Sequence, residues 1–153
     1  QDGRSSRPQV PGTVARGTLR EDDHFHRGRV RGEYAAEFPS PVSRSMLERG
    51  RERYDIFCAP CHDRLGLGLG MVVRRGFTRP ESFHTDRLRE APPGYFFDVM
   101  TNGFRAMDGQ SEQIDAADRW AIAAYIRVLQ RSRNARIEDV PEERRGELER
   151  GSG

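Results

Sequence analysis

The sequence contains no lysine, and all 26 of its Lys and Arg residues are arginine. Arginine stays charged and can bind a carboxylate through two parallel hydrogen bonds, so such a surface suits contacts with acidic partners. The 24 acidic residues leave a formal net charge of only +2. This charge is too small for a nucleic-acid-binding domain, and the aromatic residues are not interleaved with a basic patch.

Long apolar stretches are missing too. No run of about 18 apolar residues occurs, so we expect no transmembrane span in this chain. Hydrophobic residues make up 35% and charged residues 33% of the 153 residues, and the mean hydropathy is −0.84. We therefore expect part of the chain to lie outside any core, and a non-protein group to fill part of the interior. The chain begins at Gln1, and we expect that a targeting segment has been removed.

Cysteine is also scarce, and the two cysteines stand together in Cys58-Ala59-Pro60-Cys61-His62. This Cys-x-x-Cys-His pattern is typical of covalent haem attachment. Two thiols about one helical turn apart can each add to a vinyl group on one porphyrin edge, and the histidine beside them can bind the iron as the proximal ligand. The single motif predicts one haem c, which would supply the missing interior.

Three other interpretations of the cysteines fit less well. A thioredoxin-like site expects a βαβ context, and no convincing strand or internal repeat is present. A structural zinc site needs four ligands, and Cys58, Cys61 and His84 leave one missing. A disulfide across two intervening residues would be strained.

The sixth iron ligand has four candidates. Met71 follows His62 closely in the same loop, which makes the opposite haem face hard to reach, and Met100 falls inside a predicted helix as a packing residue. Met107 lies in a loop between two predicted helices and can fold across the distal face, so it is favoured over His84 and Met71. For the other ring nitrogen of His62, the Pro80 carbonyl is the expected acceptor.

The chain divides into three parts. Residues 1–44 carry four prolines, several glycines and isolated apolar residues, which predicts an extended arm for subunit contacts rather than a core, with a free disordered tail as the alternative. Residues 45–133 hold the helical patterns and residues 134–153 form a charged tail. Helices are expected after the capping box of Ser45 and Glu48, over 85–90, over 94–101 and from Asp115 onward, with a loop over 64–80.

This layout resembles the class I cytochromes c, which implies an all-α fold. Gly50 and Tyr54 on the first helix, facing Trp120 through Tyr125 on the last, resemble the pair of helices that pack together in that family. The resemblance also implies that Pro80 holds the ligand histidine and that Met107, which follows Asn102-Gly103, binds the iron. One departure is Asp108, where the family usually has proline.

Longer segments resemble the monohaem cytochrome c subunit of bacterial alternative complex III, a quinol-oxidising membrane complex. The similarity covers most of residues 14–131 and is carried by VARGTLRED (14–22), GMVVRRGF (70–77), SFHTDRLR (82–89), GYFFDVMTNGF (94–104) and DRWAIAAYIRVLQ (118–130). It implies a subunit on the periplasmic side of the inner membrane, often lipid-anchored. Its partners would be other subunits of the respiratory complex and an oxidase or soluble cytochrome that accepts the electrons.

Three functions compete at this point. The arm and tail favour an electron-transfer subunit, which is not itself an enzyme, over a free periplasmic shuttle that needs neither. A peroxidase would require an open iron position, and no acid–base pair flanks the Met107 loop. Arg74 and Arg75 suit haem propionates or a partner surface equally well, and His24, His26 and His84 are interpreted as surface or interface residues.

Overall fold

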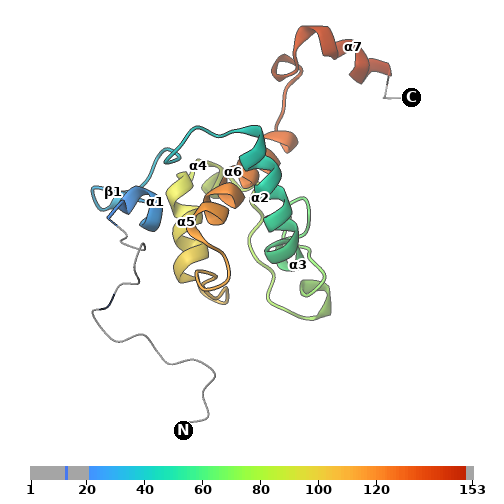
Figure 1. Cartoon of the computed structure of the whole chain (residues 1–153). Helices are drawn as coiled ribbons and strands as arrows, with labels where there is room; N and C mark the ends of the chain where they lie inside the picture. The colour runs from blue at the N-terminus through green and yellow to red at the C-terminus, as the bar shows by residue number, and fades with distance from the viewer. Residues whose placement is uncertain (1–12, 14–20, 151–153) are drawn as a thin grey trace.

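The computed structural model describes Thr13 and residues 21–150, and the side chains of residues 147–150 are not described. Most of the expected arm, residues 1–12 and 14–20, therefore lies outside the described residues. The elements shown in Figure 1 follow in the order α1 Asp23–Arg27, β1 Arg29–Val30, β2 Glu33–Tyr34, α2 Arg44–Phe57, α3 Ala59–His62, η1 Val73–Arg75, α4 Asp86–Glu90, α5 Pro93–Asn102, α6 Ala116–Arg133, η2 Ile137–Asp139 and α7 Glu142–Arg150.

The N-cap of helix α2 lies two residues before the predicted one, Ser45. Its N-cap is Ser43, whose Oγ accepts a hydrogen bond of 3.1 Å from the Met46 amide. With Ser43 as the N-cap, Glu48 is no longer three residues after it, and its carboxylate pairs with Arg44 at 2.9 Å. Both serines are good N-cap residues, and the helix uses the earlier one.

The crossing of α2 and α6 is the central packing contact of the domain. A Cβ on Gly50 would lie 2.0 Å from the Ala121 carbonyl oxygen, so the two backbones touch at this glycine. On the exposed side of the crossing, the Arg49 guanidinium binds both carboxylate oxygens of Asp118, at 2.7 and 2.9 Å. The glycine and aromatic arrangement expected from the class I cytochrome c resemblance is therefore present.

Helix α6 supplies the largest share of the core. Its N-cap is Asp115, as expected, and the Asp115 carboxylate accepts from the Asp118 amide at 2.8 Å. Trp120 is 1% exposed and stacks on Phe97 of α5 with ring centroids 4.6 Å apart. Met100 of α5 is 4% exposed, which agrees with its predicted role as a packing residue.

The part of the expected arm that the structure describes folds back on this core. Trp120 Nε1 donates to the Phe25 carbonyl at 2.8 Å, and Ala35 is fully buried. The backbone of Ala35 bonds both Gly28 and Gly94, at 2.8 and 3.0 Å. Residues 21–43 thus include a short helix and a hairpin of two two-residue strands, which pack on α5 and α6, and they are not the extended chain that their composition suggested.

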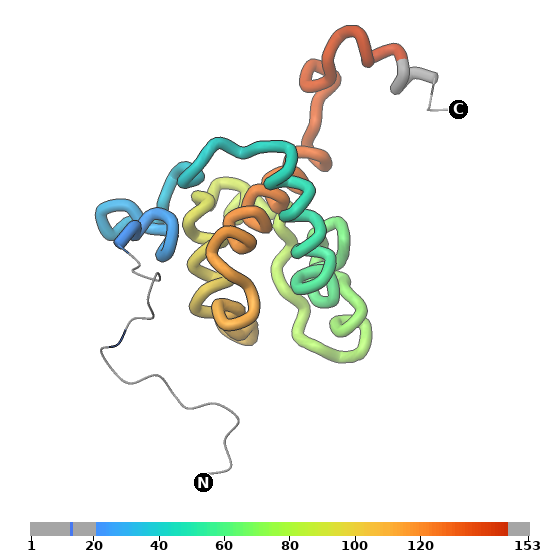
Figure 2. The backbone as a smooth tube through the Cα atoms, in the orientation of Figure 1, coloured from blue at the N-terminus to red at the C-terminus, as the bar shows by residue number. Residues whose placement is uncertain are grey.

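The C-terminal tail contains a helix. In Figure 2 the tube from η2 into α7 leaves the helical domain and projects away from it. Glu142 and Glu143 begin this helix and are exposed. None of the helices in the described part of the chain has the length and apolar character needed to cross a membrane.

Candidate haem-attachment site

The Cys-x-x-Cys-His motif forms a corner between two helices. Helix α2 ends at Phe57 and Cys58 is its C-cap, whose amide donates to the Tyr54 carbonyl at 2.9 Å; the single turn of α3 carries Cys61 and His62. Pro60 stands at the start of α3, where its missing N–H costs nothing. The His62 amide bonds the Cys58 carbonyl at 2.8 Å, so the motif is wound as one helical turn.

The chemistry of the three motif side chains suits a thioether-linked haem. Both thiols are free and half-buried. Burial, followed by the charge of Cys61, raises the pKa of Cys58 to about 12, so this thiol stays protonated at neutral pH. Burial lowers the pKa of His62 to about 4 against an opposing effect of Asp63, which leaves the imidazole neutral and able to bind a metal.

The His62 ring lies flat against Phe83, with centroids 4.6 Å apart and planes 12° from parallel. Its Nδ1 is buried and has no hydrogen-bond partner among the described residues. The Pro80 carbonyl lies next to the backbone of Gly68, because a Cβ on Gly68 would be 2.3 Å from the Pro80 oxygen. The Pro80 carbonyl forms no hydrogen bond with His62 Nδ1. The Pro80–His62 bond stays a prediction.

A glycine-rich loop over residues 64–72 packs against the motif turn and hydrogen-bonds its carbonyl groups. The amides of Gly68, Gly70 and Val72 donate to the carbonyls of His62, Cys61 and Pro60, at 3.0, 3.1 and 3.1 Å. A Cβ on Gly70 would lie 2.2 Å from the Pro60 oxygen, so the loop backbone can reach these carbonyls only because the residue is glycine. The loop expected over 64–80 is thus an ordered cap on α3.

The four candidate sixth ligands are in different environments. Met100 belongs to the core, Met71 is 59% exposed, and His84 Nε2 is hydrogen-bonded to the Leu65 carbonyl at 2.7 Å. Met107 ends a tight turn whose two backbone bonds to Phe104 measure 2.8 and 3.0 Å, and its side chain is half-buried against the core. The turn fixes Met107 in place, and its role as iron ligand stays a prediction.

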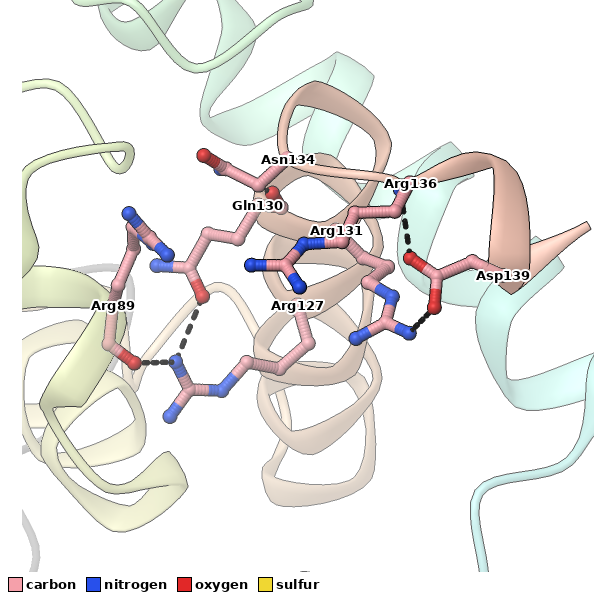
Figure 3. Close-up of a pocket in the computed structure, with 7 residues that line it drawn as sticks. All are labelled: Arg89, Arg127, Gln130, Arg131, Asn134, Arg136 and Asp139. Carbon is pink, nitrogen blue, oxygen red and sulfur yellow. Dashed lines mark hydrogen bonds and ion pairs between the residues drawn. The ribbon is translucent and has the colours of Figure 1, made fainter.

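A pocket of about 540 Å³ lies at the C-terminal end of α6 (Figure 3). Arg127 lines it, and its Nη1 donates to the Arg89 carbonyl at 3.1 Å and to Gln130 Oε1 at 2.7 Å. The same guanidinium also bonds the Ala91 carbonyl. Arg127 therefore satisfies the last carbonyls of α4, which explains its position in structural terms.

A hydrogen bond from Tyr54 connects α2 to Asp63, the residue after the haem motif. Its ring is fully buried, and its hydroxyl donates to the Asp63 carbonyl at 2.7 Å. We expect Tyr54→Phe to keep the packing but to leave this carbonyl unsatisfied, lowering the free energy of unfolding by about 1–3 kcal/mol. Denaturant unfolding would measure the loss.

The matched control is Tyr125→Phe, because the Tyr125 ring contacts Tyr54 but its hydroxyl forms no hydrogen bond among the described residues. We expect a change below about 0.5 kcal/mol for this variant. Equal losses for the two variants would contradict a role for the Tyr54 hydroxyl.

Helix order, the α2–α6 crossing and the motif corner together define a haem-binding domain with the class I cytochrome c fold. Residues 45–126 match the family described as Cytochrome C oxidase, cbb3-type, subunit III. This match spans more than half of the chain, and the chain therefore belongs to that cytochrome c family. Membership implies covalently bound haem c and haem-based electron transfer, and the motif residues described above fit that group.

The chain is similar to several solved structures, of which two are described. One is the Kuenenia stuttgartiensis reducing HAO-like protein complex Kustc0457/Kustc0458, with a TM-score of 0.53, 19% identity, and coverage of 70% of this chain and 54% of the other. This chain thus spans about half the length of that relative. The other is cytochrome cL from the marine methylotrophic bacterium Methylophaga aminisulfidivorans MPT, with a TM-score of 0.46, 15% identity and coverage of 69% and 67%. The curated proteins include no match to the chain.

Sequence reasoning missed two residues that shape the site. Phe83 was not assigned a role, although its ring covers His62. Asp63, directly after the motif, was also passed over, although its carboxylate bonds several amides of the glycine-rich loop. The regular alternation of glycine and leucine over residues 65–70 was the available signal, because glycine at every second position indicates a loop that folds tightly and whose backbone groups need partners.

Proposed function

We propose that this chain carries one haem c through Cys58 and Cys61, with His62 and Met107 as the axial ligands and the Pro80 carbonyl bonded to the His62 ring. The observation that carries this is the motif corner, where two free thiols and a neutral imidazole share a single helical turn. When bound, the haem supplies a one-electron redox centre. The protein holds it in place, orients the imidazole and excludes water.

The wider role that we propose is electron transfer within a quinol-oxidising respiratory complex of the alternative complex III type, on the periplasmic side of the membrane. The resemblance of the segments between residues 14 and 130 supports this assignment. The projecting, charged α7 also supports it, because an exposed helix outside the domain is suited to contact another subunit. The alternative is a free periplasmic shuttle.

Purification under mild detergent separates the two roles. We expect the haem-containing chain to elute with other subunits, and the assembly to reduce this haem when quinol is added. A monomeric 17.5 kDa haemoprotein that is fully reduced by the isolated upstream complex would instead favour the shuttle.

We expect Met107→Ala to abolish the methionine–iron charge-transfer band and to lower the reduction potential. Methionine favours the reduced iron more than histidine or water does, so its loss destabilises that state. Absorption spectra of the oxidised protein and a redox titration would measure both effects. With Met107 bound to the iron, no coordination position would be open for peroxidase chemistry.

Met71→Ala is the matched control, since Met71 is an exposed methionine in the loop next to the motif. We expect it to keep the band and the potential. If the band survives in Met107→Ala and disappears in Met71→Ala, the assignment of the sixth ligand is wrong.

A further inference from the structure

The residue after the haem motif adopts an unusual backbone conformation. Asp63 is the C-cap of α3 and has φ 58° and ψ 171°, a region that residues with a side chain rarely enter. Such a conformation persists only where the surrounding bonds hold it. The Tyr54 hydroxyl supplies one of these bonds by donating to the Asp63 carbonyl.

The Asp63 carboxylate supplies the others. Its Oδ1 accepts from the Leu65 amide at 2.7 Å, and its Oδ2 accepts from the Leu69 amide at 2.8 Å. The Leu67 amide lies between them, 3.3 Å from Oδ1 and 3.2 Å from Oδ2. One carboxylate therefore holds three alternate amides of the loop through charge-assisted hydrogen bonds.

Three other amides of this loop bond the motif turn. Gly68, Gly70 and Val72 bond the carbonyls of α3, as described above. The loop is thus divided between two partners: the three leucine amides bond the Asp63 carboxylate and the Gly66 amide bonds the Asp63 carbonyl at 3.3 Å, whereas the amides of Gly68, Gly70 and Val72 bond the motif turn. Through these hydrogen bonds, Asp63 helps to hold the loop on the turn that carries Cys61 and His62.

The loop in turn holds the segment that covers His62. The Gly66 carbonyl accepts from the Phe83 amide at 2.9 Å, and the Leu65 carbonyl accepts from His84 Nε2 at 2.7 Å. A Cβ on Gly66 would lie 2.7 Å from the Phe83 ring, so the loop backbone and this ring are in direct contact. Phe83 then stacks on the imidazole of His62.

From these contacts we propose that Asp63 is a positioning residue for the haem ligand His62. Its carboxylate fixes the loop, the loop fixes Phe83, and Phe83 fixes the plane of the imidazole. The proposal rests on the proposed haem ligation by His62. The proposal goes beyond that ligation because it assigns the orientation of the His62 ring to one carboxylate, which is not expected to contact the iron.

The test uses the haem-loaded full chain and three substitutions. Asp63→Ala removes the acceptor, Asp63→Asn keeps one oxygen for Leu65 and Leu67, and Asp63→Gly removes the acceptor but accepts the positive φ without strain. Asp55→Ala is the matched control, because it removes the same charge near the motif from a side chain with no hydrogen bond among the described residues.

Two measurements report the outcome. We expect amide hydrogen exchange at Leu65, Leu67 and Leu69 to rise by about tenfold or more in the Ala and Gly variants and by less in the Asn variant. We expect the paramagnetically shifted NMR signals of the His62 ring and the reduction potential to move in the same order. The Asp55→Ala control should leave the exchange rates and the ring signals unchanged.

The proposal would be overturned if exchange rises while the His62 signals stay at their wild-type positions, since Asp63 would then only stabilise the loop. It would also be overturned if Asp63→Gly behaves like the wild type, because backbone conformation alone would then explain the residue. A wild-type chain that binds no haem, or binds it without His62, would instead refute the proposed function, and the exchange result on the loop would still stand.

Discussion

Replacing both Cys58 and Cys61 with alanine is expected to abolish covalent haem attachment. Each thioether needs its own sulfur, and the described residues contain no other cysteine that could substitute. Haem that remains bound through His62 alone would be extracted by acidified acetone, whereas the wild-type pigment should stay with the polypeptide. Absorption in the Soret region after extraction, together with the mass of the intact protein, would measure the loss.

The single substitutions refine this expectation. Cys58→Ala and Cys61→Ala should each keep one thioether, and therefore retain pigment after extraction with a shifted pyridine haemochrome spectrum. Pro60→Ala is the matched control, because it changes the motif turn without removing a thiol or the imidazole. Pigment that resists extraction in the double variant would contradict the assignment of the two cysteines.

The helical framework could be predicted from the sequence where the signals are local. The apolar period of α6 and its Asp115 N-cap lie within a few residues of each other, as do Pro93 and Gly103 at the ends of α5. The structure confirms these helices to within a residue or two. The Cys-x-x-Cys-His motif is local in the same sense, and the covalent haem that it predicts agrees with the family match.

The parts that could not be predicted depend on contacts between distant residues. Residues 21–44 look like an arm by composition, but the burial of Ala35 and the bond from Trp120 to the Phe25 carbonyl fold them onto α6. The role of Asp63 depends on a positive φ that favours glycine and that no pattern assigns to an aspartate. The position of Met107 likewise depends on the tight turn that it forms with Phe104.

Gly50→Ala is expected to destabilise the domain by about 3 kcal/mol, although alanine is the better helix former by about 1 kcal/mol. The added methyl group would lie 2.0 Å from the Ala121 carbonyl oxygen and 3.1 Å from Tyr125 Cβ. Both contacts are made by α6, and the nearer is to its backbone, so the two helices must move apart rather than change a rotamer. Denaturant unfolding of the haem-loaded chain, followed by circular dichroism, would measure the loss.

Gly146→Ala provides the matched control, since a Cβ at this glycine of α7 meets nothing within 4 Å. We expect it to leave the unfolding midpoint of the domain unchanged to within about 0.5 kcal/mol. Both substitutions improve helix propensity, but only Gly50 lies where two helices approach closely. Comparing the two variants therefore separates these two effects on stability. A Gly50→Ala variant as stable as the wild type would mean that α2 and α6 do not cross at this glycine, and the position of the motif corner relative to α6 would have to be reassigned.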